Sequence, residues 1–212
     1  MPALKVCGIT RRGDLDACDR LGVDAVGINL WSGSKRGLTA SQAEALLQGG
    51  RGAQRVGVFV DHAPREVAAL ARTLELDAIQ PHGDTPPESF AALGLPWVWV
   101  IRGTPALATL AIPKPLPTWI LLDAAVAGFG GAGAKTDWVW AAAAVQALSP
   151  LPVWLAGGIT PDNAAEALAQ VKPAGLDVAS GSEVVGATRG EKDVARIEAL
   201  LRAVRATSDA AW

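Results

Sequence analysis

Cysteine is scarce in this chain of 212 residues, which contains only Cys7 and Cys18. Two cysteines are too few for a disulfide framework, and neither belongs to a CxxC pair that would indicate a zinc site. The apolar runs are also too short for the core of a signal peptide or for a membrane span. We therefore expect a protein that stays in the reducing cytoplasm and does not bind a membrane.

Charge of either sign is low as well. Only 19% of the residues are charged and the formal net charge is −2, so no overall field attracts nucleic acid or another polyanion. Half of the residues are hydrophobic, which excludes a disordered chain and favours central strands that are buried on both faces. The length is typical of one domain with a sizeable core.

Short apolar runs alternate with segments of helical spacing along the whole chain. Strands are predicted over residues 4–7, 25–30, 55–60, 78–80, 97–101, 119–123, 153–156 and 176–179. Helices are predicted over residues 15–21, 41–47, 65–74, 138–148, 162–171 and 194–204. Thr160 before Pro161, and Ala63 before Pro64, are typical helix starts. Because residues 104–117 include four prolines, they are expected to form one short helix and a loop.

Eight alternations of strand and helix predict a single-domain (β/α)8 TIM barrel over residues 1–207, followed by a short tail over residues 208–212. The main alternative is an open, doubly wound sheet. No linker or break in composition divides the chain, which favours the barrel.

In such barrels the chemistry lies at the carboxyl ends of the strands. The candidates at those positions are Cys7, Asn29, Asp61, His82, Arg102, Asp123, Gly157 with Gly158, and Ser180 with Gly181. Side chains alternate along a strand, so Cys7 shares a face with Lys5, Asp123 with Leu121, and His82 with Gln80. We interpret these faces as the barrel interior, where the Lys5 ammonium group needs a countercharge. Asp177 on the eighth strand is expected to supply it.

Phosphate is the expected ligand of the last two strand ends. The loops after the seventh and eighth strands form the common phosphate site of this architecture, and glycine lets backbone N–H groups approach an anion. Here they carry Gly157-Gly158 and Ser180-Gly181, although the glycines could also serve only to turn the chain. A phosphorylated small molecule is therefore predicted, bound in part by a short helix that starts at Ser182.

A glycine-rich stretch follows the sixth strand. Gly128, Gly130 and Gly133 satisfy GxGxxG, but they lie several residues beyond the strand, and Ala134 stands where the Walker A pattern requires glycine before lysine. A lid over the site that includes Gly130, Gly131 and Gly133 fits better, with a plain loop as the alternative.

Cys7 and Asp123 are the strongest candidates for catalysis. Cys7 ends the first strand and points the same way as Lys5, whose charge could help the thiolate to form. Asp123 ends an apolar strand, where an unpaired carboxylate is unfavourable unless it has a role or a partner. His82 fits a ligand-binding and a structural role equally, and Cys18 on a helix is assigned to packing.

In this order the motifs resemble the phosphoribosylanthranilate isomerases. Lys5-Val6-Cys7-Gly8-Ile9-Thr10 is similar to their opening KxCGIT, and Gly27 to Arg36 is similar to their GxxFxxxSxR. Further matches are residues 56–60, 80–84, 121–123, 130–133 with 137–138, 155–158 and 177–181. The chain departs from the family pattern at Leu30, Pro81, Thr85, Ala132 and Thr136, which bears on loop ordering and substrate packing.

The resemblance implies a step of tryptophan biosynthesis, the Amadori rearrangement of N-(5-phosphoribosyl)anthranilate to 1-(2-carboxyphenylamino)-1-deoxyribulose 5-phosphate. Asp123 would be the general acid and Cys7 the general base, while Arg36 would hold the anthranilate carboxylate. Gln80 and His82 would also contact this phosphorylated aminosugar. The resemblance implies no metal and no other cofactor, and the chain is expected to be a monomer or a homodimer.

Two alternatives remain, one another isomerase and one a protein of a different class. A related phosphosugar barrel isomerase, such as that of histidine biosynthesis, would have an aspartate as base on the first strand, where this chain has Cys7. A non-catalytic nucleotide-binding α/β domain would be built around the GxGxxG match.

Overall fold

The computed structural model describes residues 1–49, 51–124, 135–186 and 190–209. Eight parallel strands form one sheet in the order β4-β3-β2-β1-β8-β7-β6-β5. They are β1 (Ala3–Cys7), β2 (Ala25–Asn29), β3 (Gln54–Val60), β4 (Ala78–His82), β5 (Val98–Arg102), β6 (Trp119–Asp123), β7 (Val153–Leu155) and β8 (Gly175–Val178). The predicted strands are confirmed to within a residue or two at each end.

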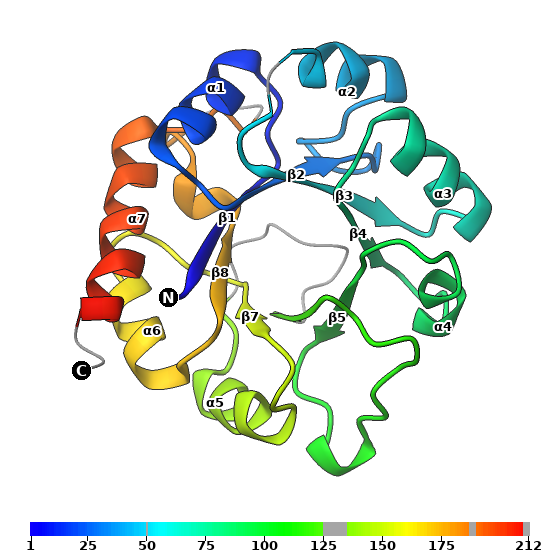
Figure 1. The fold of residues 1–212 in the computed structure, drawn as a ribbon. Helices are drawn as coiled ribbons and strands as arrows, with labels where there is room; N and C mark the ends of the chain where they lie inside the picture. The colour runs from blue at the N-terminus through cyan, green and yellow to red at the C-terminus, as the bar shows by residue number, and fades with distance from the viewer. Residues whose placement is uncertain (50, 125–134, 187–189, 210–212) are drawn as a thin grey trace.

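The sheet closes into a barrel. First and last strands are neighbours, with Lys5 of β1 opposite Asp177 of β8. At the remaining seam, between β4 and β5, one bridge joins Ile79 to Trp97, and the Ile79 N–H donates to the Pro96 carbonyl at 2.9 Å. Figure 1 looks along the barrel axis and shows the strands as a ring inside the helices. The predicted TIM barrel is therefore confirmed, and the open doubly wound sheet is excluded.

Helices cover the outer surface of the ring. They are α1 (Arg12–Leu21), α2 (Ala40–Leu47), α3 (Pro64–Thr73), α4 (Pro87–Ala91), α5 (Trp138–Ala147), α6 (Ala164–Val171) and α7 (Val194–Asp209). Proline opens α3 as expected, and a 3-10 turn, η1 (Leu107–Thr109), is the one short helix among residues 104–117. None of the described helices is long and apolar enough to cross a membrane.

The start of α6 differs from the prediction. Asn163, not Thr160, is its N-cap residue, and the helix begins at Ala164. The Asn163 side chain accepts a hydrogen bond from the Thr160 N–H at 2.8 Å and donates to the Gly158 carbonyl at 2.9 Å. These bonds hold residues 161–163 in a turn and so delay the helix. They also brace the loop after β7, which bears on the site.

The hydrophobic core has two parts. A larger cluster packs between the strands and the helices, and a smaller cluster fills the barrel interior from alternate strand positions. Within the smaller cluster the Trp119 and Trp154 rings stack with their centroids 5.2 Å apart. Gly175 lies against Trp154, and a Cβ there would fall 2.6 Å from that ring. The packed interior leaves the carboxyl ends of the strands as the open end of the barrel.

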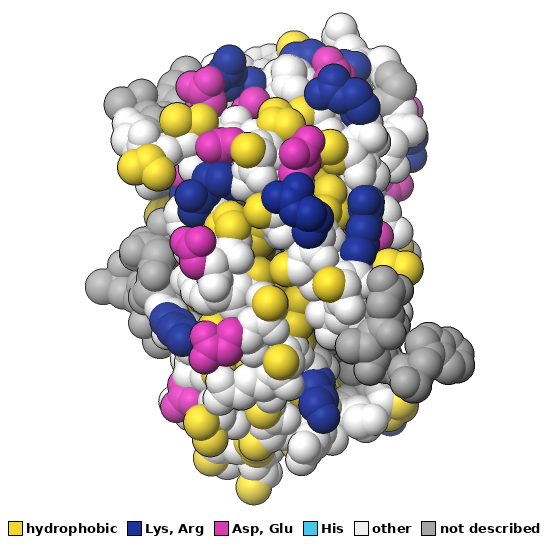
Figure 2. Space-filling view, turned by 90° about the vertical axis from the view of Figure 1, so that its left-hand side faces the viewer, with side chains coloured by type: hydrophobic (Ala, Val, Ile, Leu, Met, Phe, Trp, Pro, Cys, Tyr) yellow, Lys and Arg dark blue, Asp and Glu magenta, His cyan; other side chains and the backbone are white. Residues whose placement is uncertain are grey.

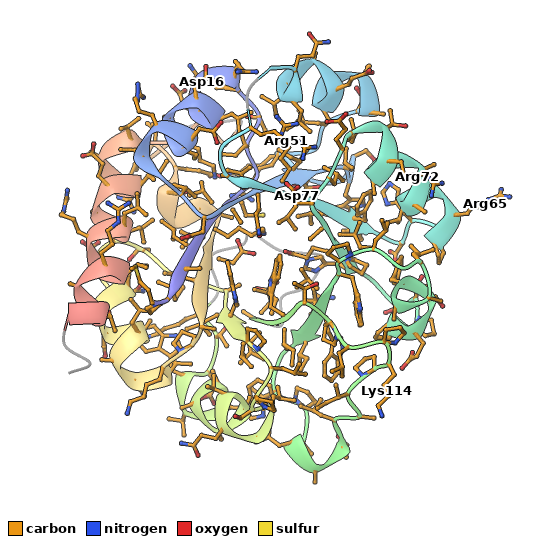
Figure 3. All side chains as sticks on the ribbon, in the orientation of Figure 1. Asp16, Arg51, Arg65, Arg72, Asp77 and Lys114 are labelled. Atoms are coloured by element: carbon orange, nitrogen blue, oxygen red, sulfur yellow. The ribbon has the colours of Figure 1, made fainter. Side chains whose placement is uncertain are left out.

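Charged side chains gather at the surface and at the amino ends of the strands. Figure 2 shows cationic and anionic side chains mixed over the face made by α1, α6 and α7. Arg51, before β3, forms ion pairs with Glu75 at 3.0 Å and with Asp77, before β4, at 3.3 Å. Arg51 and Asp77 lie together in Figure 3, whereas Arg65 of α3 projects outward. This ion pairing ties together loops at the end of the barrel opposite to the predicted site.

Candidate active site

One cavity opens at the carboxyl ends of the strands and gathers most of the predicted site residues. Its lining includes Cys7, Arg36, Gln80, His82, Asp123, Gly157, Gly158 and Ser180. The predicted interior faces are confirmed, because Leu121 also lines the cavity and Lys5 is completely buried. Asp61 and Arg102 also end strands but do not line this cavity.

Lys5 and Asp177 form the predicted ion pair inside the barrel. The Lys5 Nζ donates to Asp177 Oδ2 at 2.7 Å, and both side chains are almost fully buried. Burial by itself would lower the pKa of Lys5, but the interactions with Asp177 and Cys7 together outweigh it and raise that pKa above its ordinary value. Lys5 therefore stays charged beneath the cavity floor.

Cys7 is a thiol surrounded by cations. Burial raises the pKa of Cys7 above its ordinary value, and Lys5, Lys192 and Arg36 lower it by less than burial raises it. Lys5 was expected to help the thiolate form, but its charge does not outweigh burial, and the charge of Asp177 raises the pKa of Cys7 further. At neutral pH the free protein therefore holds Cys7 mainly as the neutral thiol.

Asp123 must hold a proton before it can donate one, and its environment raises its pKa. Burial and the nearby charge of Asp177 raise the pKa of Asp123 to about 6, although a hydrogen bond from the Ala124 N–H to Asp123 Oδ1, 2.9 Å long, opposes the shift. A carboxylic acid with this pKa carries a proton in a useful fraction of molecules near neutral pH.

His82 is a neutral ring in this cavity. Burial, with the charges of Lys5 and Arg102, lowers the pKa of His82 to about 3. Its Nε2 lies 3.0 Å from Gln80 Nε2, and Gln80 Oε1 is buried without a hydrogen-bond partner among the described residues. The pair therefore offers neutral polar groups to a ligand and no net charge.

The two loops expected to bind phosphate lie next to each other. Gly157 and Gly158 have positive φ angles of 86° and 65°, a conformation that favours glycine. Gly181 does not line the cavity; a Cβ there would fall 1.9 Å from the Ile159 carbonyl oxygen, so its role is to let the loops approach. The short helix is a 3-10 turn, η2 (Ser180–Ser182), and it ends at Ser182 rather than starting there. The predicted lid residues Gly130, Gly131 and Gly133 lie outside the described residues.

Cys18, the second thiol, is fully buried in the outer core. Burial raises its pKa to about 12, so the predicted packing role is confirmed.

Three residues near the cavity are not singled out by the sequence alone. Trp31 lines the cavity, and Glu183 and Lys192 are buried. Nothing in the local pattern of a loop separates such residues from solvated ones.

Within the described part of the chain, no cluster of three or more His, Cys, Asp or Glu side chains is arranged to hold a metal ion.

Comparisons with known proteins identify the family of this chain. The family model of N-(5'phosphoribosyl)anthranilate (PRA) isomerase matches residues 4–203. The N-(5'-phosphoribosyl)anthranilate isomerase of Myxococcus xanthus is 39% identical over 207 residues, covering 95% of each chain. The crystal structure of phosphoribosyl anthranilate isomerase from Thermus thermophilus superposes with a TM-score of 0.83 at 33% identity, over 97% of this chain and 99% of that one.

A further solved structure bears on the ligand. It is a phosphoribosyl anthranilate isomerase in complex with reduced 1-(o-carboxyphenylamino)-1-deoxyribulose 5-phosphate, and it superposes with a TM-score of 0.80 at 26% identity, over 97% of this chain and all of the other. The chain belongs to the N-(5'-phosphoribosyl)anthranilate isomerase family.

Proposed function

We propose that this protein isomerises N-(5-phosphoribosyl)anthranilate to 1-(2-carboxyphenylamino)-1-deoxyribulose 5-phosphate with Asp123 as general acid and Cys7 as general base. The observation that carries the proposal is that both residues line one cavity and that the environment of the acid raises its pKa to about 6. Family membership supports the same reaction. The enzyme is thus an aldose–ketose isomerase of tryptophan biosynthesis.

Ring opening is the first chemical step. Asp123 donates its proton to the furanose ring oxygen, the bond from that oxygen to C1 breaks, and the nitrogen lone pair forms a cationic Schiff base at C1. A pKa of about 6 makes Asp123 a stronger proton donor than a neutral thiol and leaves it protonated more often than an ordinary aspartate.

Proton removal from C2 is the second step. The positive Schiff base withdraws electrons from C2 and makes its proton more acidic. Cys7 first releases its thiol proton to solvent, and the resulting thiolate accepts the C2 proton to give an enolamine. Burial raises the pKa of Cys7, so the thiolate needs a positive charge to stabilise it. The cationic Schiff base of the substrate supplies that charge. The enolamine then takes a proton at C1 and loses its O2 proton to give the ketone.

Three groups hold the substrate in this scheme. Arg36 lines the cavity and binds the anthranilate carboxylate, which suits a planar guanidinium group. Gln80 and the neutral His82 bind sugar hydroxyls, which can satisfy the buried Gln80 Oε1. The phosphate binds between Gly157-Gly158 and Ser180, with Gly181 allowing the two loops to meet.

The location we propose is the cytoplasm, because a base that works as a free thiol needs a reducing compartment. Cys7 and Cys18 are both free.

The test is the loss of phosphoribosylanthranilate fluorescence catalysed by the purified protein and by Asp123→Asn. General acid–base groups each contribute about 10²–10⁴-fold, so Asp123→Asn is expected to lower kcat by at least about 100-fold while the circular dichroism spectrum stays unchanged. A wild-type protein without activity would refute the function. An Asp123→Asn protein with nearly full activity would refute the assignment of the acid.

A further inference from the structure

Arg36 is held in one orientation by its surroundings. Its residue exposure is only 5%, and its aliphatic stem packs against Gly8 and Gly190, at both of which a Cβ would fall within 3.0 Å of Arg36 side-chain carbons. Arg36 Nε donates to Glu183 Oε1 at 2.5 Å. Among the described residues, its Nη2 is buried with no hydrogen-bond partner. One edge of the guanidinium group is therefore occupied by protein, and an unsatisfied donor remains on a side chain that lines the cavity.

Glu183 is the residue that occupies that edge. It does not line the cavity. Besides its ion pair with Arg36, its carboxylate forms ion pairs with Lys35 Nζ at 3.0 Å and with Lys192 Nζ at 3.4 Å. Burial by itself would raise the pKa of Glu183, but the hydrogen bond from Arg36 and the charge of Lys192 outweigh it and lower the pKa to about 2. Glu183 thus stays ionised at every pH at which an enzyme of this kind works.

Lys192 connects Glu183 to the strand that ends at Cys7. Its side chain is fully buried, and its Nζ donates to the Cys7 carbonyl at 2.7 Å and to the Ala179 carbonyl at 3.1 Å. An isolated antiparallel bridge pairs Lys192 with Glu183, and the Lys192 N–H donates to Asp14 of α1 at 3.1 Å. Figure 1 shows this segment, drawn in orange after β8, beside β1 and α1.

The charges of this cluster are unbalanced. Three cations contact the single Glu183 carboxylate, while Asp14 bonds to the Lys192 backbone rather than to its ammonium group. A buried cluster with an excess of positive charge and a free guanidinium donor favours a second carboxylate, and a ligand can supply it.

We propose that Glu183 and Lys192 are positioning residues, Glu183 for the guanidinium group of Arg36 and Lys192 for the end of β1 that carries Cys7. The inference rests on the proposed function, since it requires Arg36 to bind the substrate carboxylate and Cys7 to act as base. Glu183 fixes the plane of Arg36 so that Nη2 faces the substrate. Lys192 ties the loop after β8 and Cys7 into one unit with that clamp.

A double-mutant cycle tests the role of Glu183. Glu183→Gln keeps the shape and removes the charge, and loss of one charge-assisted hydrogen bond corresponds to about tenfold in affinity. We expect KM for phosphoribosylanthranilate to rise about tenfold with kcat within about twofold. In the Arg36→Met background, Glu183→Gln should change KM by less than about twofold. Glu75→Gln, which removes an ion-paired glutamate at the opposite end of the barrel, is the matched control and should leave both parameters unchanged.

Lys192→Met is expected to lower kcat about tenfold and to raise KM by a smaller factor. The reason is that it loosens the end of β1 that carries Cys7 rather than the contact between Arg36 and the substrate. Equal changes of kcat and KM in the Glu183 and Lys192 variants would overturn the proposal, as would a KM effect of Glu183→Gln that persists when Arg36 is absent. Should Glu183→Gln fail to fold by circular dichroism, Glu183→Asp keeps the charge but shortens the reach, and the same cycle applies to it. An Arg36→Met protein with unchanged KM would instead refute the carboxylate clamp of the proposed function.

Discussion

Replacing Asp123 by asparagine is expected to stabilise the fold while it removes the proposed acid. Burial and the charge of Asp177 raise the pKa of Asp123 to about 6, against about 3.9 for an unperturbed aspartate. Because the folded-state pKa is raised, the stability contributed by this group is complete below about pH 4 and is lost as the pH rises through about 6. Asparagine cannot ionise, yet it keeps an oxygen that can accept the bond from the Ala124 N–H.

The size of the effect follows from the shift. Two pKa units correspond to about 3 kcal/mol at 1.36 kcal/mol per unit, which is the upper limit at neutral pH. The Asp123 side chain is partly exposed at the end of β6, so solvent screening reduces this figure. We expect Asp123→Asn to raise the free energy of unfolding by about 1–2 kcal/mol at pH 7.5. For a chain of this size each kcal/mol is worth about 2–4 °C in Tm.

Urea unfolding of both proteins at several pH values provides the assay. The difference in free energy of unfolding should be largest at pH 7.5 and should shrink towards zero near pH 4. Asp162→Asn, at an exposed aspartate, is the control and should show a small difference that does not vary with pH. An Asp123→Asn protein that is less stable than wild type at pH 7.5, or a gain that is independent of pH, would refute the reasoning.

Three further outcomes are expected. Asp177→Asn should lower the free energy of unfolding by about 3–5 kcal/mol, because it leaves the buried Lys5 ammonium group unpaired; a loss below about 1 kcal/mol in urea would contradict this. Arg36→Ala should raise KM more than it lowers kcat in steady-state kinetics, since a carboxylate clamp holds ground and transition states alike. A crystal soaked in phosphate should hold the anion between residues 157–158 and Ser180, and an anion bound only elsewhere would show the assignment to be wrong.

Much of the barrel could be predicted because its strands are short apolar runs that end in polar or glycine residues. The Lys5–Asp177 pair followed from two simple requirements, a countercharge for an inward ammonium group and adjacency of the first and last strands. The predicted start of α6 was wrong. Asn163 forms hydrogen bonds with Thr160 and Gly158, and a capping pattern in the sequence does not reveal such side-chain contacts.

The site was predictable only in part. Cys7 and Asp123 end strands, so topology alone places them at one edge. Arg36 lies in a loop, and only the resemblance to a family pointed to it. Glu183 and Lys192 come from an irregular segment after β8 whose pairing has no periodic signal, so a buried ionic cluster there cannot be told from a solvated loop before the fold is known.

The two thiols offer the most direct test of the central claim that Cys7 is the base. Cys7 lines the cavity, whereas Cys18 is fully buried in the outer core, so one substitution in each separates chemistry from packing. With phosphoribosylanthranilate as substrate, Cys7→Ser is expected to lower kcat by at least about 100-fold, and Cys18→Ser to leave kcat within a few-fold of wild type. Near wild-type turnover by Cys7→Ser, together with loss of activity in Cys18→Ser, would contradict the mechanism.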